Sequence, residues 1–199
     1  MKRGLRGKEM QGIRKARVSG SASCHFVPVR ALIDPASLKT LIASHTHKIY
    51  LKPGEVVVSV EPVLVSTVLG SCVAVTMFSA STGFSAICHA MLPESKGRDN
   101  GLRYVDSALR HIYDKSVAYG AGNDLVVKLF GGGQVMDIGG LATDRRTVGD
   151  QNVAQAEAVL YSLGLTITAR DTGGLWGRKL FFCTRSGDVL LRRMRHVKY

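Results

Sequence analysis

The sequence predicts a single α/β domain in which helices pack on a mixed β-sheet. Strand-like apolar segments are followed along the chain by a helix, a strand, a second helix and further strands. Hairpin-like pairs of strands lie at both ends of this series, and such antiparallel pairs argue against a purely parallel, doubly wound sheet. With 199 residues, the chain is long enough to bury a hydrophobic core of its own.

The strands expected before the first long helix are short apolar runs bounded by turn residues. β-Branched residues over 56–60 and 63–69 predict two paired strands, and the run over 73–78 predicts a third. The turn-like segment Ser-Ala-Ser-Thr over 79–82 leads into a fourth strand over 83–92. The third and fourth strands are therefore expected to form a hairpin.

Two helices and four more strands are expected in the rest of the chain. Apolar residues recur at helical spacing over 102–119 and again over 150–163. The strands are predicted over 124–130, 165–169, 179–184 and 189–194. The last two of these strands form a terminal hairpin around the turn residues 185–188.

The first hairpin brings a cysteine and a histidine together. With a loop over 79–82, Phe78 pairs with Gly83 and Cys72 pairs with His89. Directly opposed residues share a sheet face, with Cβ atoms about 4.5–5.5 Å apart. A loop of odd length would instead place the two side chains on opposite faces. In the expected register the thiol lies beside an imidazole that can deprotonate it, which predicts a thiol-dependent acyl-transfer site.

The neighbours of this pair suggest further roles. Cys72 follows a Gly-Ser turn, whose backbone N–H groups are expected to lower the pKa of the thiol and to hold an oxyanion. Strand alternation puts Cys88 on the opposite face from His89, in the core. Ser66 and Thr67 lie near the end of the strand that precedes Cys72, and the hydroxyl of either residue could orient the imidazole.

The spacing of possible ligands disfavours metal and phosphate sites. Cys72, Cys88, His89 and Cys183 do not form the close Cys and His pairs of structural zinc sites. A triple glycine, Gly131–Gly133, follows a predicted strand, but no Lys-Ser/Thr pair follows at the P-loop offset. We therefore expect no metal, and we attribute the glycines to a tight turn or to the close approach of a substrate backbone.

Positive charge is concentrated near the N-terminus. Of a formal net charge of +12, residues 1–50 carry +8. Helix-like spacing over 31–45 is interrupted by Pro35. We expect residues 1–47 to form a basic, flexible extension and residues 48–199 to form the domain. A basic arm can bind nucleic acid, but this one lacks interleaved aromatic residues, so no nucleic-acid partner is expected.

Composition also predicts where the protein works. No segment approaches the roughly 18 apolar residues that a membrane-spanning helix needs, so no membrane insertion is expected. The basic start is not followed by the apolar region of a secretory signal. The four cysteines show no even spacing, which favours reduced thiols over a disulfide framework. These features predict a cytoplasmic protein.

Five segments together resemble the CheD family, the chemoreceptor glutamine deamidases of bacterial and archaeal chemotaxis. They are STVLGSCVAV (66–75), HAMLP (89–93), KLFGGG (128–133), VGDQN (148–152) and RDTGGLWGRKLFF (170–182). The resemblance covers the chain from about residue 50 to about residue 195 and leaves the basic start unexplained. The chain departs from the usual family pattern in two places, where Gly133-Gln134 replaces Gly-Ala and VGDQN replaces IGxRN.

The resemblance implies an α/β sandwich that deamidates receptor glutamines without a cofactor. Cys72 would attack the carboxamide, and His89 would accept the thiol proton and deliver it to the departing ammonia. The family's third catalytic position is a threonine just upstream of the cysteine, filled here by Thr67 or Ser66, with Thr67 favoured. The implied partners are the cytoplasmic helices of chemoreceptors and a CheC-type phosphatase. The alternative is a noncatalytic adaptor that binds chemoreceptors or such a phosphatase, and an intact cysteine–histidine pair favours the enzyme.

Overall fold

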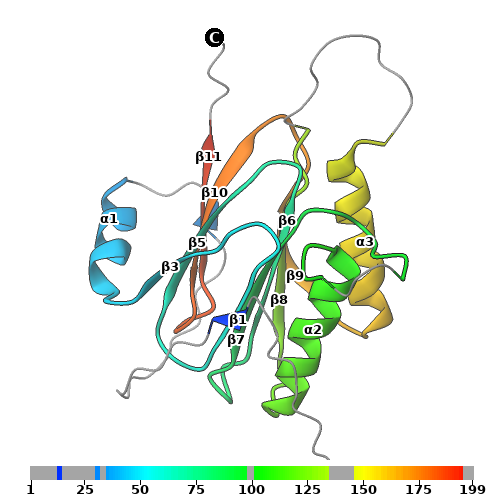
Figure 1. Cartoon of the computed structure of the whole chain (residues 1–199). Helices are drawn as coiled ribbons and strands as arrows, with labels where there is room; N and C mark the ends of the chain where they lie inside the picture. Colours follow the sequence, from blue (N-terminus) through cyan, green and yellow to red (C-terminus); the bar gives the residue numbers. More distant parts are fainter. Residues whose placement is uncertain (1–12, 15–29, 32–34, 98–100, 135–145, 195–199) are drawn as a thin grey trace, which may run out of the picture.

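Two β-sheets packed face to face form the centre of the molecule, and two helices cover the outer face of one of them (Figure 1). The computed structural model describes residues 13–14, 30–31, 35–97, 101–134 and 146–194. The predicted fold class, a single α/β domain with helices packed on a mixed sheet, is confirmed. The presence of a second sheet was not predicted.

Within the described residues, the first sheet has six strands in the order β1-β4-β7-β6-β8-β9. Their bounds are Ile13–Arg14 (β1), Val56–Ser59 (β4), Val73–Phe78 (β6), Ser85–Ala90 (β7), Val126–Gly131 (β8) and Ile167–Thr172 (β9). The four central strands are antiparallel to one another, whereas β1 joins β4 and β9 joins β8 in parallel. This sheet is therefore mixed.

The second sheet has five strands in the order β2-β11-β10-β5-β3 within the same described ranges. Their bounds are Arg30–Ala31 (β2), Lys48–Tyr50 (β3), Leu64–Leu69 (β5), Gly177–Cys183 (β10) and Val189–Met194 (β11). The predicted terminal hairpin is present as the antiparallel pair β10–β11, and β5 lies antiparallel to β10 on its other side. This second sheet is what allows residues of β5 to face the first sheet.

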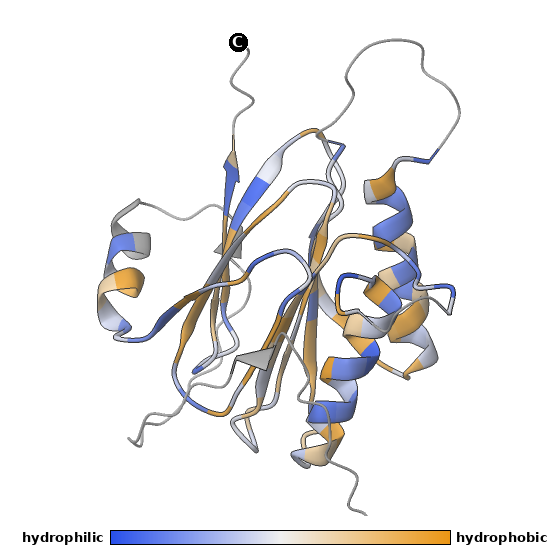
Figure 2. Ribbon diagram, in the orientation of Figure 1, coloured by the Kyte–Doolittle hydropathy of each residue, from blue (hydrophilic) through white to orange (hydrophobic). Residues whose placement is uncertain are grey.

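Two buried apolar clusters hold the layers together. One lies between the first sheet and the helices α2 (Val105–Ala118) and α3 (Val148–Ser162), and the other lies between the two sheets. Along β6, Val73 and Val75 face the helices, whereas Ala74 faces the second sheet. Because both faces of the central strands are buried, their sequences are nearly continuous apolar runs, seen as orange strands in Figure 2.

The predicted pairing of the first two strands, 56–60 and 63–69, is wrong. The corresponding strands β4 and β5 belong to different sheets, with β4 paired to β7 and β5 paired to β10 and β3. Two-residue hairpin turns need positive φ angles at their centre, which Asn-Gly or Gly-Gly sequences supply. The link here contains Glu61-Pro62, and proline holds φ near −65°. The chain therefore crosses from one sheet to the other.

The predicted register of the first hairpin is also wrong, by two residues. Phe78 pairs with Ser85 and Ala74 pairs with His89, so Cys72 is not directly opposite His89. The Ser79 N–H donates to the Phe84 carbonyl over 2.9 Å, which leaves a four-residue loop over 80–83. Gly83 has a φ of +70°, a conformation that suits a loop better than the strand position predicted for it. A shift of two preserves side-chain alternation, so position 72 stays on the His89 face as a diagonal neighbour.

Parts of the predicted N-terminal extension adjoin the domain. The two-residue strands β1 and β2 lie at the edges of the two sheets, and α1 (Pro35–Ser44) lies on the outer side of the second sheet (Figure 1). Just after α1, the His45 Nε2 atom lies 3.2 Å from the Cys183 Sγ atom. The boundary between 47 and 48 remains a prediction.

Shortening the chain to residues 48–199 should lower the thermal midpoint of unfolding by no more than a few degrees. Among the described residues, the cluster between the sheets begins at Ile49 and the cluster under the helices begins at Val56, so the shortened chain keeps both of them. The comparison is made by circular dichroism on the full and shortened chains at one ionic strength. A large drop in the midpoint would show that residues before 48 are part of the folded domain.

Candidate functional site

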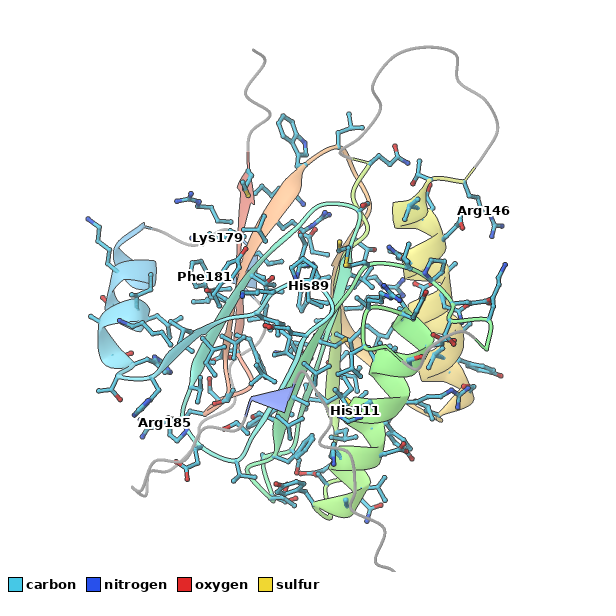
Figure 3. The ribbon with its side chains drawn as sticks, in the orientation of Figure 1. His89, His111, Arg146, Lys179, Phe181 and Arg185 are labelled. Carbon is cyan, nitrogen blue, oxygen red and sulfur yellow. The ribbon has the colours of Figure 1, made fainter. Side chains whose placement is uncertain are left out.

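His89 lies between the two sheets, near the end of β7 (Figure 3). Its side chain is 1% exposed. The backbone is held by the loop before β4, because the His89 N–H donates to Glu55 O over 3.0 Å and the Gly54 N–H donates to His89 O over 2.8 Å. The imidazole therefore has a fixed position inside the molecule.

A hydrogen bond to Thr67 on β5 orients the imidazole. The Thr67 Oγ1 atom lies 2.8 Å from His89 Nδ1 and donates to the Leu51 carbonyl over 2.8 Å. A carbonyl can only accept, so the hydroxyl proton points to Leu51 and the proton shared with His89 must sit on Nδ1. Nε2 is then an unprotonated acceptor, and within the described residues this buried atom has no hydrogen-bond partner.

The choice between Thr67 and Ser66 follows from the side-chain alternation of β5. Thr67 is fully buried on the face toward the first sheet. Ser66 lies on the other face, opposite Phe181, which together with Lys179 lies on the α1 side of the second sheet (Figure 3). Only Thr67 of this pair is hydrogen-bonded to His89.

Cys72 lies in the turn between β5 and β6, where hydrogen bonds from two backbone N–H groups and one side chain hold three successive carbonyl groups. Gly133 N–H donates to Gly70 O over 2.7 Å, and Gly132 N–H donates to Cys72 O over 2.8 Å. Between them, Asn152 Nδ2 donates to Ser71 O over 2.9 Å. The side chain of Cys72 packs against the apolar cluster between the sheets, on the side into which His89 projects.

The close contact between this turn, the end of β8 and the start of α3 requires glycine. A Cβ atom at Gly131 would lie 2.2 Å from the Cys72 carbonyl oxygen, and one at Gly149 would lie 2.5 Å from the Gly132 oxygen. The backbone that approaches the triple glycine closely is the chain's own, that of the Cys72 turn and of α3. α3 itself begins with a capping box between Thr147 and Asp150.

Asn152 on α3 connects the two arms of the hairpin. It is fully buried, and Nδ2 donates to Ser71 O and to Met91 O, each over 2.9 Å. Ser71 precedes Cys72 and Met91 follows His89 by two residues, so one amide group holds both arms beyond the last ladder pair, Val73–Ala90. Its Oδ1 atom is buried with no partner among the described residues.

Burial sets the protonation of the three groups. Burial raises the pKa of the Cys72 thiol, and a hydrogen bond from its own backbone N–H offsets this only in part. The expected lowering of this pKa is therefore wrong. Burial lowers the pKa of His89 to about 4 and raises that of Cys88 to about 12. At neutral pH the site holds a neutral thiol and a neutral imidazole, and Cys88 is an unreactive thiol on the helix-facing side of the sheet.

Sequence reasoning missed the role of Asn152, which appeared only within the VGDQN segment. One signal was present, because Asn152 precedes Ala156, Val159 and Leu160 by helical spacing and so lies on the apolar face of its helix. A polar residue on such a face needs hydrogen-bond partners. The acceptor role of the Leu51 carbonyl left no signal in the sequence.

No group of three or more metal-binding side chains is found among the residues that the structure describes. Within the same residues, no helix is long and apolar enough to cross a membrane.

Comparison with known proteins identifies the family. The family model described as CheD chemotactic sensory transduction matches residues 91–193, just over half of the chain. A protein of Geobacter sulfurreducens named probable chemoreceptor glutamine deamidase CheD 2 is 45% identical over 151 residues, which cover 75% of this chain and 92% of the relative. A protein of Nitratidesulfovibrio vulgaris named probable chemoreceptor glutamine deamidase CheD is 40% identical, over 82% of this chain and 84% of the relative. A protein of the same name in Pyrococcus horikoshii is 34% identical, over 65% of this chain and 82% of the relative.

An α/β sandwich with a cysteine and a histidine at the junction of its two sheets has the groups that a thiol-dependent hydrolase uses. This chain belongs to the CheD family. The segment matched by the family model begins at Met91, so Thr67, Cys72 and His89 lie before it.

The free energy of unfolding should fall as the pH drops from about 6.5 toward 4. The pKa of His89 is about 4 in the folded protein and 6.5 for the free side chain, so the unfolded chain binds the extra proton in this range. Stability from the neutral imidazole is complete above 6.5 and is lost on the way to 4, by roughly 3 kcal/mol. Urea titrations at several pH values measure the slope.

The His89→Gln variant should lack this part of the pH dependence. The exposed His47 provides a matched control, because His47→Gln removes a histidine outside the site and should keep the dependence. An unchanged slope in His89→Gln would contradict the assignment of this loss to His89.

Proposed function

We propose that this protein is a protein-glutamine deamidase that converts chemoreceptor glutamines to glutamate through a thioester on Cys72. The observation that carries the proposal is the orientation of His89, whose Nδ1 bonds to Thr67 and whose free Nε2 lies on the Cys72 side of the sheet. Membership of the CheD family and the names of the relatives support the choice of substrate.

In the first step Cys72 adds to the side-chain carboxamide of a glutamine. The S–H proton moves to His89 Nε2 as the bond between sulfur and the carboxamide carbon forms, and the carbonyl oxygen takes the negative charge. Since burial disfavours both the thiolate and the imidazolium, we propose that proton transfer accompanies attack. A stable ion pair before substrate binding is not needed.

The backbone of the Cys72 turn would stabilise the charged oxygen. The carbonyls of Gly70, Ser71 and Cys72 are all held by donors from Asn152 and from the triple glycine Gly131–Gly133, called the glycine loop below. The backbone N–H of Cys72 faces its own sulfur, where it favours negative charge, so it can donate to an oxyanion that develops beside the sulfur. The fixed turn avoids reorganisation during the reaction.

The intermediate then collapses and is hydrolysed. The proton on Nε2 passes to the carboxamide nitrogen as the C–N bond breaks, and ammonia leaves behind a thioester. A water molecule attacks the thioester carbon and gives a proton to Nε2, the S–C bond breaks, and the sulfur takes the proton back from Nε2. The products are glutamate and ammonia, and the reaction needs no cofactor.

The proposal also includes the protein's setting. The substrate glutamines lie on the cytoplasmic helices of chemoreceptors, and a CheC-type phosphatase is a second protein partner. The reaction takes place in the cytoplasm, where a reduced thiol is maintained. The family relationship supports this setting.

Cys72→Ala and Cys72→Ser should abolish deamidation of a chemoreceptor cytoplasmic fragment, because a serine hydroxyl is too weakly nucleophilic in this site. Cys88→Ala is the matched control and should keep most of the activity, since Cys88 faces the helices. Mass spectrometry of receptor peptides detects the conversion of glutamine to glutamate. If folded Cys88→Ala loses turnover and Cys72→Ala keeps it, the nucleophile is Cys88 and the assignment of Cys72 is wrong.

Thr67→Val should lose part of the roughly 10²–10⁴-fold contribution of a general base, because Nδ1 would have no oriented partner. Thr67→Ser restores a hydroxyl and should recover most of the rate. Ser66→Ala removes the hydroxyl on the other face and should leave kcat nearly unchanged. If Thr67→Val and Ser66→Ala have equal kcat values and equal pH–rate profiles, Thr67 does not position His89.

A further inference from the structure

The turn between β9 and β10 presents two large apolar side chains to solvent. Leu175 is 60% exposed and Trp176 is 44% exposed. Neither residue belongs to the apolar clusters described above. Adjacent exposed residues of this size are typical of binding surfaces, in which tryptophan is enriched.

Buried polar contacts make this turn rigid. Arg178 has a side chain only 4% exposed, and its Nε bonds to Asp171 Oδ1 over 2.6 Å. The same guanidinium donates to Gly173 O over 2.6 Å and to Trp176 O over 3.2 Å, so it holds both sides of the turn. Burying an ion pair is costly in free energy, and one use of such a pair is to hold a single conformation. The apolar tip is thus pre-organised for binding.

The β9–β10 turn lies at the same end of the two sheets as the turn between β5 and β6, which carries Cys72 (Figure 1). Gly173 N–H donates to Gly131 O over 2.9 Å, and Gln134 N–H donates to Gly174 O over 2.8 Å. The glycine loop between these two contacts also binds the Cys72 turn, through Gly132 N–H and Cys72 O. One short loop therefore separates the exposed tip from the nucleophile.

The neighbouring surface of β11 is basic. Arg192 is exposed on the same face of the second sheet as its ladder partner Lys179, and Met194, opposite Gly177, shares this face and is 39% exposed. Arg193 points to the other face, where it bonds to Asp171. Asp171, the nearby acid, is already bonded to two arginines. The surface is therefore apolar with a positive margin, which is complementary to an apolar stripe flanked by acidic residues.

We infer that Leu175, Trp176 and Met194, with Arg192, form a docking surface for the substrate protein. The occupant is an amphipathic helix whose apolar stripe covers Leu175 and Trp176 and whose acidic flank faces Arg192. This inference rests on the proposed function, because the helix belongs to the chemoreceptor whose glutamine enters the site. A glutamine on a helix can reach Cys72 through its side chain alone, without pairing its backbone to a strand.

The test measures binding apart from chemistry. A Cys72→Ala protein binds the receptor cytoplasmic fragment without turnover, and Trp176→Ala and Leu175→Ser are added to it one at a time. Each addition should weaken binding about tenfold or more, as expected for a residue at the centre of an interface. Tyr161→Ala is the matched control, because Tyr161 is 86% exposed near the C-terminal end of α3. It should not change the affinity.

Kinetics on the active protein, in which Cys72 is unchanged, separate docking from catalysis. Trp176→Ala should raise KM about tenfold with little change in kcat or in the rate at which iodoacetamide alkylates Cys72. Arg192→Glu should also raise KM, and this effect should shrink as salt rises, because exposed charges are screened beyond about 8 Å at physiological ionic strength. A loss of kcat and alkylation in Trp176→Ala would make it part of the catalytic structure and overturn docking.

Other results distinguish a failure of the docking surface from a failure of the proposed enzyme. Equal receptor affinity with and without Trp176→Ala would refute the docking surface even if deamidation proceeds. Binding that depends on Trp176, without any deamidation by the protein in which Cys72 is unchanged, would support docking and refute the proposed enzyme. If Trp176→Ala weakens binding to anionic vesicles or to DNA but not to the receptor fragment, the assigned occupant is wrong. It is also wrong if the receptor fragment does not bind at all.

Discussion

The hydrogen bond between His89 and Thr67 crosses the interface between the two sheets, and the candidate site depends on it. The imidazole is on β7 of the first sheet and the hydroxyl is on β5 of the second, so the bond exists only when the sheets are packed together. The Leu51 carbonyl accepts a hydrogen bond from the Thr67 hydroxyl, so that hydroxyl accepts from His89 Nδ1–H and Nε2 is left unprotonated. The tautomer of a single histidine is thus set by the packing of the whole sandwich.

Burial shapes the chemistry of this site more than charge does. The pKa values of Cys72 and His89 move apart, in the directions that keep both groups neutral. A neutral imidazole is a competent proton acceptor at physiological pH, whereas a buried imidazolium would not be. The loss of stability expected in acid is the consequence of the same burial.

The glycine loop after β8 joins three functions in one short segment. Its N–H groups hold the Cys72 turn, Gly132 packs against Gly149 of α3, and the carbonyl of Gly131 binds the β9–β10 turn. Side chains larger than hydrogen would not fit at Gly131. Nucleophile, helix and the inferred docking surface are therefore held in a fixed relation, so that a bound helix would meet a thiol that is already in position.

The sequence by itself determined the local structure and the chemical groups of this protein. Strand alternation placed β6 and β11 at their observed bounds and put Cys88 on the opposite face from His89. These features are local, because alternation repeats every two residues whatever the strand pairs with. The thiol and imidazole were found for the same reason, since an error of two residues in register leaves side chains on the same face.

Only the tertiary structure decided how these pieces are combined. The separation of β4 and β5 into two sheets depends on partners far along the chain, and alternation is the same for a hairpin and for a crossover. Thr67 rather than Ser66 bonds to His89 because of which face of β5 turns toward the first sheet. The contacts of Asn152 and Arg178 join residues that are distant in sequence or belong to turns. Such contacts arise when the layers pack, and no local pattern specifies them.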